Sequence, residues 1–90
     1  MAKLLVANWK MNLTVGEAIE LVQEITPHIS QQLVICPAFV HIPVLKEKFN
    51  ISIGAQNCAH AEFGAFTGEI SAKMLVDIGC EYVIIGHSER

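Results

Sequence analysis

The chain has 90 residues and a mass of 9.9 kDa, which is enough for one domain at most, since domains usually contain about 50–250 residues. Its 6 Lys and Arg against 9 Asp and Glu give a net charge of -3. This balance excludes the basic footprint of a nucleic-acid-binding protein and a polybasic membrane anchor. Hydrophobic residues reach 52%, so the chain is too apolar to be disordered. It is also more apolar than so small a domain needs, and we therefore expect it to contact further protein surface.

Neither a membrane span nor a secretion signal is predicted. No apolar run reaches the roughly 18 residues that a membrane-spanning helix requires, and the apolar stretch after Lys3 is too short for a signal peptide. The three cysteines, Cys36, Cys58 and Cys80, form no C-x-x-C pair, and an odd number cannot close a disulfide framework. They favour buried thiols in a reducing compartment.

The first third of the chain predicts a strand and then a helix. Residues 3–8 form a short apolar run that indicates a buried strand. Thr14 and Glu17 have the spacing of a capping box, which marks a helix start. Pro27 is expected to end or kink that helix. One apolar face follows the helical period: Val15, Ala18, Ile19, Val22 and Ile25.

A second strand, a short helix and a third strand follow. The apolar run 33–36 predicts a strand that Pro37 closes. Pro43 suits the first turn of a helix over about residues 42–49. Residues 51–56 predict the third strand.

The last third predicts a loop, a helix and a fourth strand. Residues 57–68 form a long loop with two glycines, and Gly79 is expected just past the end of the following helix. Residues 81–86 predict the fourth strand. The helical stripe between loop and strand contains Ile70, Met74, Leu75 and Ile78.

The alternation of apolar strands and helices indicates an α/β fold with a parallel sheet. Each helix would serve as the crossover between two neighbouring strands. The pattern alone leaves open whether the sheet is open or closes into a barrel.

Polar residues follow three of the predicted strands at one rim. Active sites of parallel α/β folds lie at the carboxyl ends of the strands. These ends carry Asn8 and Lys10, then Gln56 and Asn57, then His87. The set suits an anionic substrate with a polarisable carbonyl: Lys10 would hold the negative charge, and His87 would donate a hydrogen bond or act as an acid. A solvated surface lysine and an exposed histidine are the alternatives.

No metal site is expected. Cys58-x-His60 is too sparse, because metal sites usually need three or four ligands. The remaining histidines receive no role from their positions: His28, His41 and His60.

Three motifs resemble signatures of the triosephosphate isomerase family. They are Asn8-Trp9-Lys10-Met11-Asn12, then Gly64-Ala65-Phe66-Thr67-Gly68-Glu69-Ile70-Ser71, then Ile85-Gly86-His87-Ser88-Glu89-Arg90. Their order and approximate spacing agree with the family, and the resemblance covers the whole chain. Ala7 stands where many members carry glycine, which is a minor departure.

The resemblance implies a cofactor-free, cytosolic, homodimeric (β/α)8 barrel. The family interconverts dihydroxyacetone phosphate and glyceraldehyde 3-phosphate in glycolysis and gluconeogenesis. Asn8 and Lys10 would bind this small phosphorylated triose, with Lys10 also offsetting charge on the enediolate. His87 would be the neutral catalytic group that polarises the carbonyl and shuttles protons. Glu89 would lie close by, or serve as a structural ion-pair partner.

The resemblance also implies a dimer contact through loop 57–68. Thr67 and Glu69 would lie next to the partner's Lys10 and the partner's His87. Phe63 and Phe66 in this loop suit an interface, since exposed apolar patches usually mark contact sites.

Residues 1–90 would form a single partial-barrel domain, the first β-α-β-α-β-α-β portion of a barrel that takes about 250 residues. The family's base glutamate, lid loop and main phosphate site have no match here. The first and fourth strands would be open, apolar edges, which invite aggregation. Two alternatives remain: a non-catalytic half-barrel used as an interaction module, and another isomerase or aldolase-type barrel that shares this opening.

We predict that a polypeptide of these 90 residues alone has no measurable isomerase activity, because no base is available to it. Turnover of glyceraldehyde 3-phosphate by the purified polypeptide tests this. Activity that disappears in the His87→Ala variant would contradict the prediction.

Overall fold

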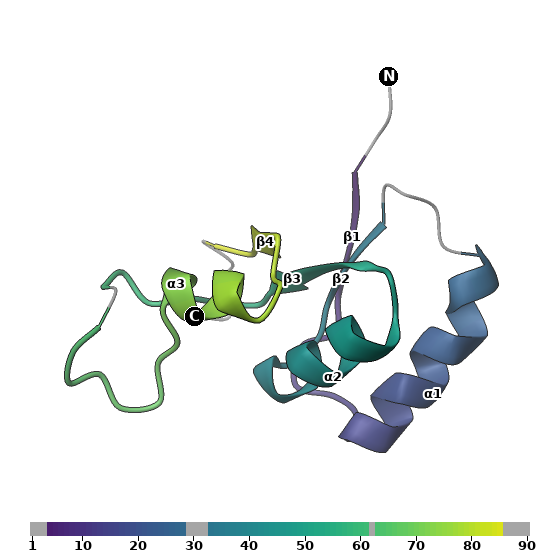
Figure 1. The fold of residues 1–90 in the computed structure, drawn as a ribbon, viewed down its shortest axis with the longest axis horizontal. Coiled ribbons are helices and arrows are strands. Elements are labelled where there is room, and N and C mark those ends of the chain that lie inside the picture. The colour runs from purple at the N-terminus through teal and green to yellow at the C-terminus, as the bar shows by residue number, and fades with distance from the viewer. Residues whose placement is uncertain (1–3, 29–32, 62, 86–90) are drawn as a thin grey trace.

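The fold is a four-stranded parallel sheet with helices between consecutive strands (Figure 1). The structure is a computed structural model that describes residues 4–28, 33–61 and 63–85. The strands follow their chain order in the sheet, and each pairs in parallel with the next. They are β1 (Leu5–Asn8), β2 (Leu33–Cys36), β3 (Ser52–Ala55) and β4 (Tyr82–Val83). The predicted α/β class and parallel sheet are confirmed.

Helices form the connections at the predicted places. In Figure 1, α1 and α2 lie beside each other on one face of the sheet, and α3 lies near β3 and β4. Within the described ranges, no helix combines the length and the apolar character that a membrane span needs. The helices are α1 (Val15–Ile25), α2 (Ile42–Lys48) and α3 (Ala72–Asp77), with 3-10 turns at Thr26–His28 and Phe39–His41.

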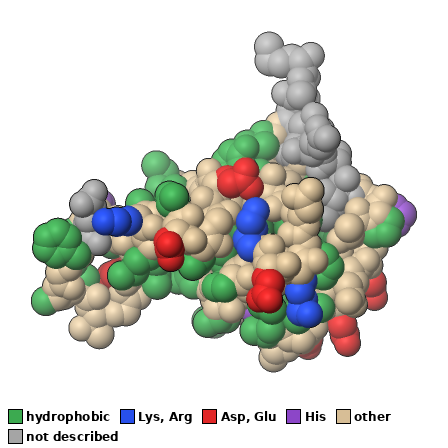
Figure 2. All heavy atoms as spheres, in the orientation of Figure 1, with side chains coloured by type: hydrophobic (Ala, Val, Ile, Leu, Met, Phe, Trp, Pro, Cys, Tyr) green, Lys and Arg blue, Asp and Glu red, His purple; other side chains and the backbone are tan. Residues whose placement is uncertain are grey.

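The capping box predicted for α1 is present. The Thr14 Oγ1 accepts a hydrogen bond from the Glu17 N–H at 3.3 Å, and the Glu17 Oε1 accepts one from the Thr14 N–H at 2.8 Å. Each bond satisfies an N–H that has no partner inside the helix. The helix ends at Ile25, two residues before Pro27, as predicted. Figure 2 shows acidic side chains over this outer part of the molecule.

The ends of α3 also follow from local sequence. The Ser71 Oγ accepts a hydrogen bond from the Met74 N–H at 3.1 Å and caps the first turn. Gly79 lies beyond the helix end with φ of 93°, the left-handed conformation predicted for a glycine there. This positive φ favours glycine, because a Cβ is strained in that conformation.

The core lies between the central strands and the helices. Val34, Ile35 and Cys36 of β2 are buried in succession, as are Ile53 and Ala55 of β3. Burial on both faces is typical of central strands in a parallel sheet. The hydrophobic core among the described residues also includes side chains from all three helices, namely Ala18, Val22, Ile42, Leu45 and Leu75.

The prediction of a buried first strand is wrong for this chain. Leu5 and Val6 of β1 are 58% and 51% exposed. The reason is position rather than composition: β1 is an edge of the described sheet and pairs only with β2. The expected apolar edges are therefore confirmed, since Tyr82 and Val83 of β4 are exposed as well.

The fourth strand is shorter than predicted. Only Tyr82 and Val83 form a ladder with β3. Parallel hydrogen bonding extends one residue to each side, from the Glu81 N–H to the Ile53 carbonyl and from the Ile84 N–H to the Ala55 carbonyl. The predicted end of this strand at residue 86 lies outside the described residues.

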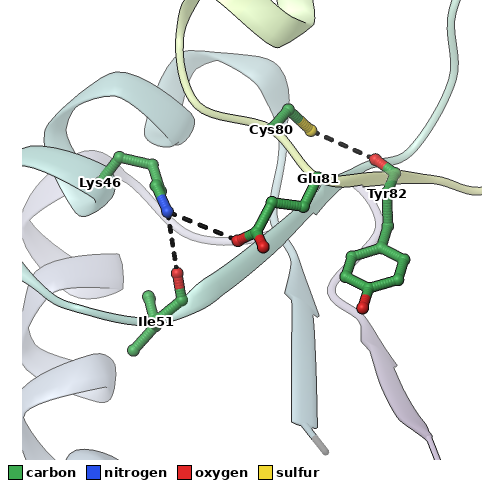
Figure 3. Close-up of polar contacts among 5 residues, drawn as sticks. All are labelled: Lys46, Ile51, Cys80, Glu81 and Tyr82. Atoms are coloured by element: carbon green, nitrogen blue, oxygen red, sulfur yellow. Dashed lines mark hydrogen bonds and ion pairs between the residues drawn. The ribbon is translucent and has the colours of Figure 1, made fainter. Parts of the chain in front are cut away.

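Lys46 links α2 to the amino ends of two strands (Figure 3). Its Nζ donates a hydrogen bond to the Ile51 carbonyl at 3.1 Å and lies 3.6 Å from the Glu81 Oε1. A partly exposed ion pair contributes about 0–1 kcal/mol to stability. The hydrogen bond to the Ile51 carbonyl adds a second contact just before β3, at the amino ends of the strands.

All three cysteines are free thiols; Cys36 and Cys80 are buried as the sequence predicts, whereas Cys58 is only partly buried. Burial raises the pKa of the Cys36 thiol, and the nearby Cys80 raises it further. Burial is also the largest cause of the raised pKa of Cys80, whose Sγ contacts the Tyr82 carbonyl at 3.2 Å (Figure 3). The folded state therefore favours the protonated form of both thiols.

We predict that replacing Leu45 by Ala lowers the free energy of unfolding by about 2–5 kcal/mol, because the side chain is fully buried and its loss leaves a cavity. Val40→Ala is the control, since Val40 is 72% exposed; its effect should stay within about 0.5 kcal/mol. Urea unfolding of the protein that carries this sequence measures both values. An equal decrease in the free energy of unfolding of the two variants would contradict the described core.

We further predict that unfolding becomes easier above about pH 8.5, the ordinary thiol pKa. In that range the unfolded chain releases thiol protons that the folded chain retains at Cys36 and Cys80, so stability falls as pH rises. Urea unfolding between pH 7 and 10 measures the slope. Stability should depend less steeply on pH in the double variant Cys36→Ala, Cys80→Ala. An unchanged slope would show that these two thiols do not cause the pH dependence.

Candidate active site

The carboxyl ends of β1, β2 and β3 meet at one rim of the sheet. Asn8, the last residue of β1, pairs with Cys36, the last residue of β2. Gln56 follows β3 directly, and its side chain reaches the end of β2 and the residues after β1. The predicted convergence of the first and third strand ends is therefore present, whereas the residues predicted to join them after the fourth strand lie outside the described ones. In parallel α/β folds this rim is where active sites form.

Lys10 has a backbone conformation that two side chains hold in place. Its φ of 56° lies in the left-handed region, which non-glycine residues seldom adopt. The Asn8 Oδ1 accepts a hydrogen bond from the Lys10 N–H at 3.0 Å. The Gln56 Nε2 donates to the Lys10 carbonyl at 2.8 Å. Both backbone polar groups of Lys10 are thus bonded to side chains at the rim.

Gln56 connects three strand ends through one amide group. Besides the Lys10 carbonyl, its Nε2 donates to the Cys36 carbonyl at 2.9 Å. The same Cys36 carbonyl accepts the Trp9 N–H at 3.0 Å. The sequence indicated only that an amide follows this strand, and this bridging role was missed. Such contacts depend on tertiary placement, which a pattern of residues does not encode.

The rim offers a cation and amides to a ligand. Lys10 and Asn8 are exposed, so their side chains are accessible to a small molecule. An ammonium group at the strand ends would attract an anion and stabilise negative charge that develops there. Because Asn8 uses its Oδ1 for the Lys10 N–H, its Nδ2 is the atom suited to donate to a ligand.

His41 takes part in this region, although its position in the sequence suggested no role. The ring is fully buried, and its Nε2 donates to the Leu13 carbonyl at 2.9 Å. The centroid of its ring lies 6.5 Å from that of Trp9. The two hydrogen-bonded residues are 28 positions apart, and no local signal links them.

Loop 57–68 extends from the sheet and is largely exposed. Phe63 and Phe66 are 85% and 58% exposed, and Thr67 and Glu69 are exposed as well. Figure 2 shows hydrophobic side chains at this end of the molecule. A cavity of about 620 Å³ lies along the loop, with Asn57, Phe66, Glu69 and Ile85 among its lining residues. Asn8 and Lys10 do not line it, whereas Asn57 and Ile85 follow the carboxyl ends of β3 and β4.

Two predicted site residues, His87 and Glu89, lie outside the described residues. The last described residue is Ile85, two positions before His87. The predicted approach of His87 to Lys10 therefore stays a prediction.

No group of three or more metal-binding side chains occurs among the residues that the structure describes. The described part of the rim instead consists of a lysine, amides and backbone carbonyls.

Comparison with known proteins places this arrangement in a family. The triosephosphate isomerase family model matches residues 3–90. A triosephosphate isomerase of Clostridium botulinum (strain Loch Maree / Type A3) is 50% identical over 97% of this chain and 38% of its own length. The one from Wolbachia pipientis wMel is 49% identical over the whole chain and 39% of its own length. That of Aquifex aeolicus (strain VF5) is 45% identical over the same shares.

The chain spans about two fifths of the length of these curated relatives. The matched residues include both described site residues, Asn8 and Lys10, and the loop that follows β3. The parallel sheet with helical crossovers agrees with the first part of a (β/α)8 barrel. The chain belongs to the triosephosphate isomerase family.

Proposed function

We propose that the protein carrying this sequence interconverts dihydroxyacetone phosphate and D-glyceraldehyde 3-phosphate by proton transfer through an enediolate. The observation that carries this proposal is Lys10, whose N–H and carbonyl are both bonded to side chains at the carboxyl rim. A fixed cation suits this substrate because the phosphate is anionic and the enediolate adds negative charge during the reaction. Membership of the family supports the same assignment.

In this proposal Lys10 and Asn8 bind the substrate. Lys10 holds its ammonium group near the oxygen that becomes negative, so its attraction is greater in the enediolate than in the ketone. Stabilisation that is greater at the transition state raises the rate, rather than only the affinity. Asn8 fixes the Lys10 backbone through its Oδ1 and directs its Nδ2 to the substrate.

His87 is proposed as the catalytic group that polarises the substrate carbonyl and moves protons between its oxygens. It follows β4, which pairs in parallel with β3. The carboxyl end of β4 therefore lies at the same edge of the sheet as Gln56. Glu89 is proposed as a nearby charged residue. No glutamate among these 90 residues is proposed as the base that removes the carbon-bound proton.

We also propose a cytoplasmic homodimer that needs no cofactor, because proton transfer requires no redox group. The dimer contact would be loop 57–68, with Thr67 and Glu69 facing the partner's site. The exposed Phe63 and Phe66 support this contact, since large exposed apolar side chains usually mark interfaces.

The test measures isomerase turnover of the protein purified from its source, together with its Lys10→Met variant. Met has a similar length and no charge, so kcat/KM should fall by about 10²–10³-fold, the effect of removing one charge-stabilising group. Lys48→Met is the control, because Lys48 is an exposed cation at the end of α2. Its activity should match that of the wild type.

A wild-type protein that forms a folded oligomer without turnover would contradict the proposed enzyme and favour an interaction module. Equal activities of the Lys10→Met and Lys48→Met variants would instead show that Lys10 has no role in the reaction.

A further inference from the structure

We propose that His41 is a positioning residue for Lys10. In this proposal its imidazole fixes the loop of residues 9–14, which carries Lys10, against the 3-10 turn that follows β2. The inference rests on the proposed function of Lys10, and His41 itself touches no substrate.

The surroundings of His41 indicate a polar role rather than simple filling of space. The side chain is fully buried, yet it is polar, which is unfavourable unless a hydrogen bond compensates. Its Nε2 lies 2.9 Å from the Leu13 carbonyl oxygen, which can only accept, so the hydrogen must be on Nε2. Its Nδ1 is buried with no hydrogen-bond partner among the described residues. A leucine would fill a similar volume without this orphaned nitrogen.

The loop that His41 contacts contains two residues in unfavourable conformations. Lys10 has φ of 56° and Leu13 has φ of 74°. Neither is a glycine, and such residues persist in the left-handed region only when surrounding contacts hold them there. The bond from His41 holds Leu13, and the bond from Gln56 holds Lys10.

His41 meets the loop on both sides of Lys10. The Trp9 ring, 6.5 Å from the imidazole centroid, precedes Lys10, and the Leu13 carbonyl follows it. The Asn12 Nδ2 also donates to the Trp9 carbonyl at 2.7 Å, which closes the loop on itself. A loop closed in this way moves as one unit. Loss of the bond to Leu13 would therefore shift the lysine, and not only the residue that lost its partner.

The experiment compares His41→Leu with His41→Gln in the protein purified at its full length. Leucine keeps the volume and removes the donor, whereas the glutamine Nε2 can occupy the place of the imidazole Nε2. Misplacement of a reactive group by about 1 Å costs up to about 10²-fold in rate. We expect kcat/KM of His41→Leu to fall by about tenfold or more, and that of His41→Gln to recover most of this loss.

A double-mutant cycle separates positioning from general stability. If His41 acts through Lys10, adding His41→Leu to Lys10→Met lowers kcat/KM no further. Additive losses would overturn the proposal, and so would a His41→Leu variant with wild-type activity. All variants are assayed at protein concentrations where sedimentation shows the same assembly and where each is folded.

A spectroscopic measurement on the wild type tests the contact without any variant. A long-range ¹H–¹⁵N spectrum should show a hydrogen on the His41 Nε2, as the Leu13 carbonyl requires. An Nε2 without a hydrogen would refute the contact. An inactive wild-type protein would contradict the proposed function. If the wild type is active and the His41→Leu variant is equally active, only the role of His41 is overturned.

Discussion

The structure depends on the parallel register of β1, β2 and β3. This register places Asn8 opposite Cys36, so that the Cys36 carbonyl is available to both the Trp9 N–H and the Gln56 amide. A slip of one residue would exchange the two faces of a strand and remove this carbonyl from the rim. The conformation of Lys10 therefore depends on the pairing of strands that lie far apart in the sequence.

The two ends of the sheet carry different kinds of contact. At the amino ends, Lys46 connects α2 with the residues before β3 and β4, which concerns stability alone. At the carboxyl ends, hydrogen bonds hold a cation in an unfavourable backbone conformation. This division agrees with the general behaviour of (β/α)8 barrels, where one face supports the fold and the other carries the chemistry. The left-handed Lys10 lies at the carboxyl ends of the strands.

Much of the fold could be predicted because its signals are local. The Thr14 capping box, the glycine at position 79 and the apolar period of α1 each act within a few residues. The burial of β1 was predicted wrongly, because an apolar run indicates a strand but not its place in the sheet. His41 and Gln56 were underestimated for a related reason: their hydrogen-bond partners lie 28 and 46 residues away. The site residues Asn8 and Lys10 could be proposed from sequence, but the contacts that hold them could not.

The central claim is that the ammonium group of Lys10, at the carboxyl rim, stabilises the negative charge of the substrate. A crystal structure of the protein with a bound phosphorylated two-carbon carboxylate, a planar anionic mimic of the enediolate, tests it most directly. The account predicts that the Lys10 Nζ lies within about 2.7–3.2 Å of an oxygen of this ligand, with the Lys10 carbonyl still bonded to Gln56. A ligand bound away from this rim, with the Lys10 side chain directed into solvent, would contradict it.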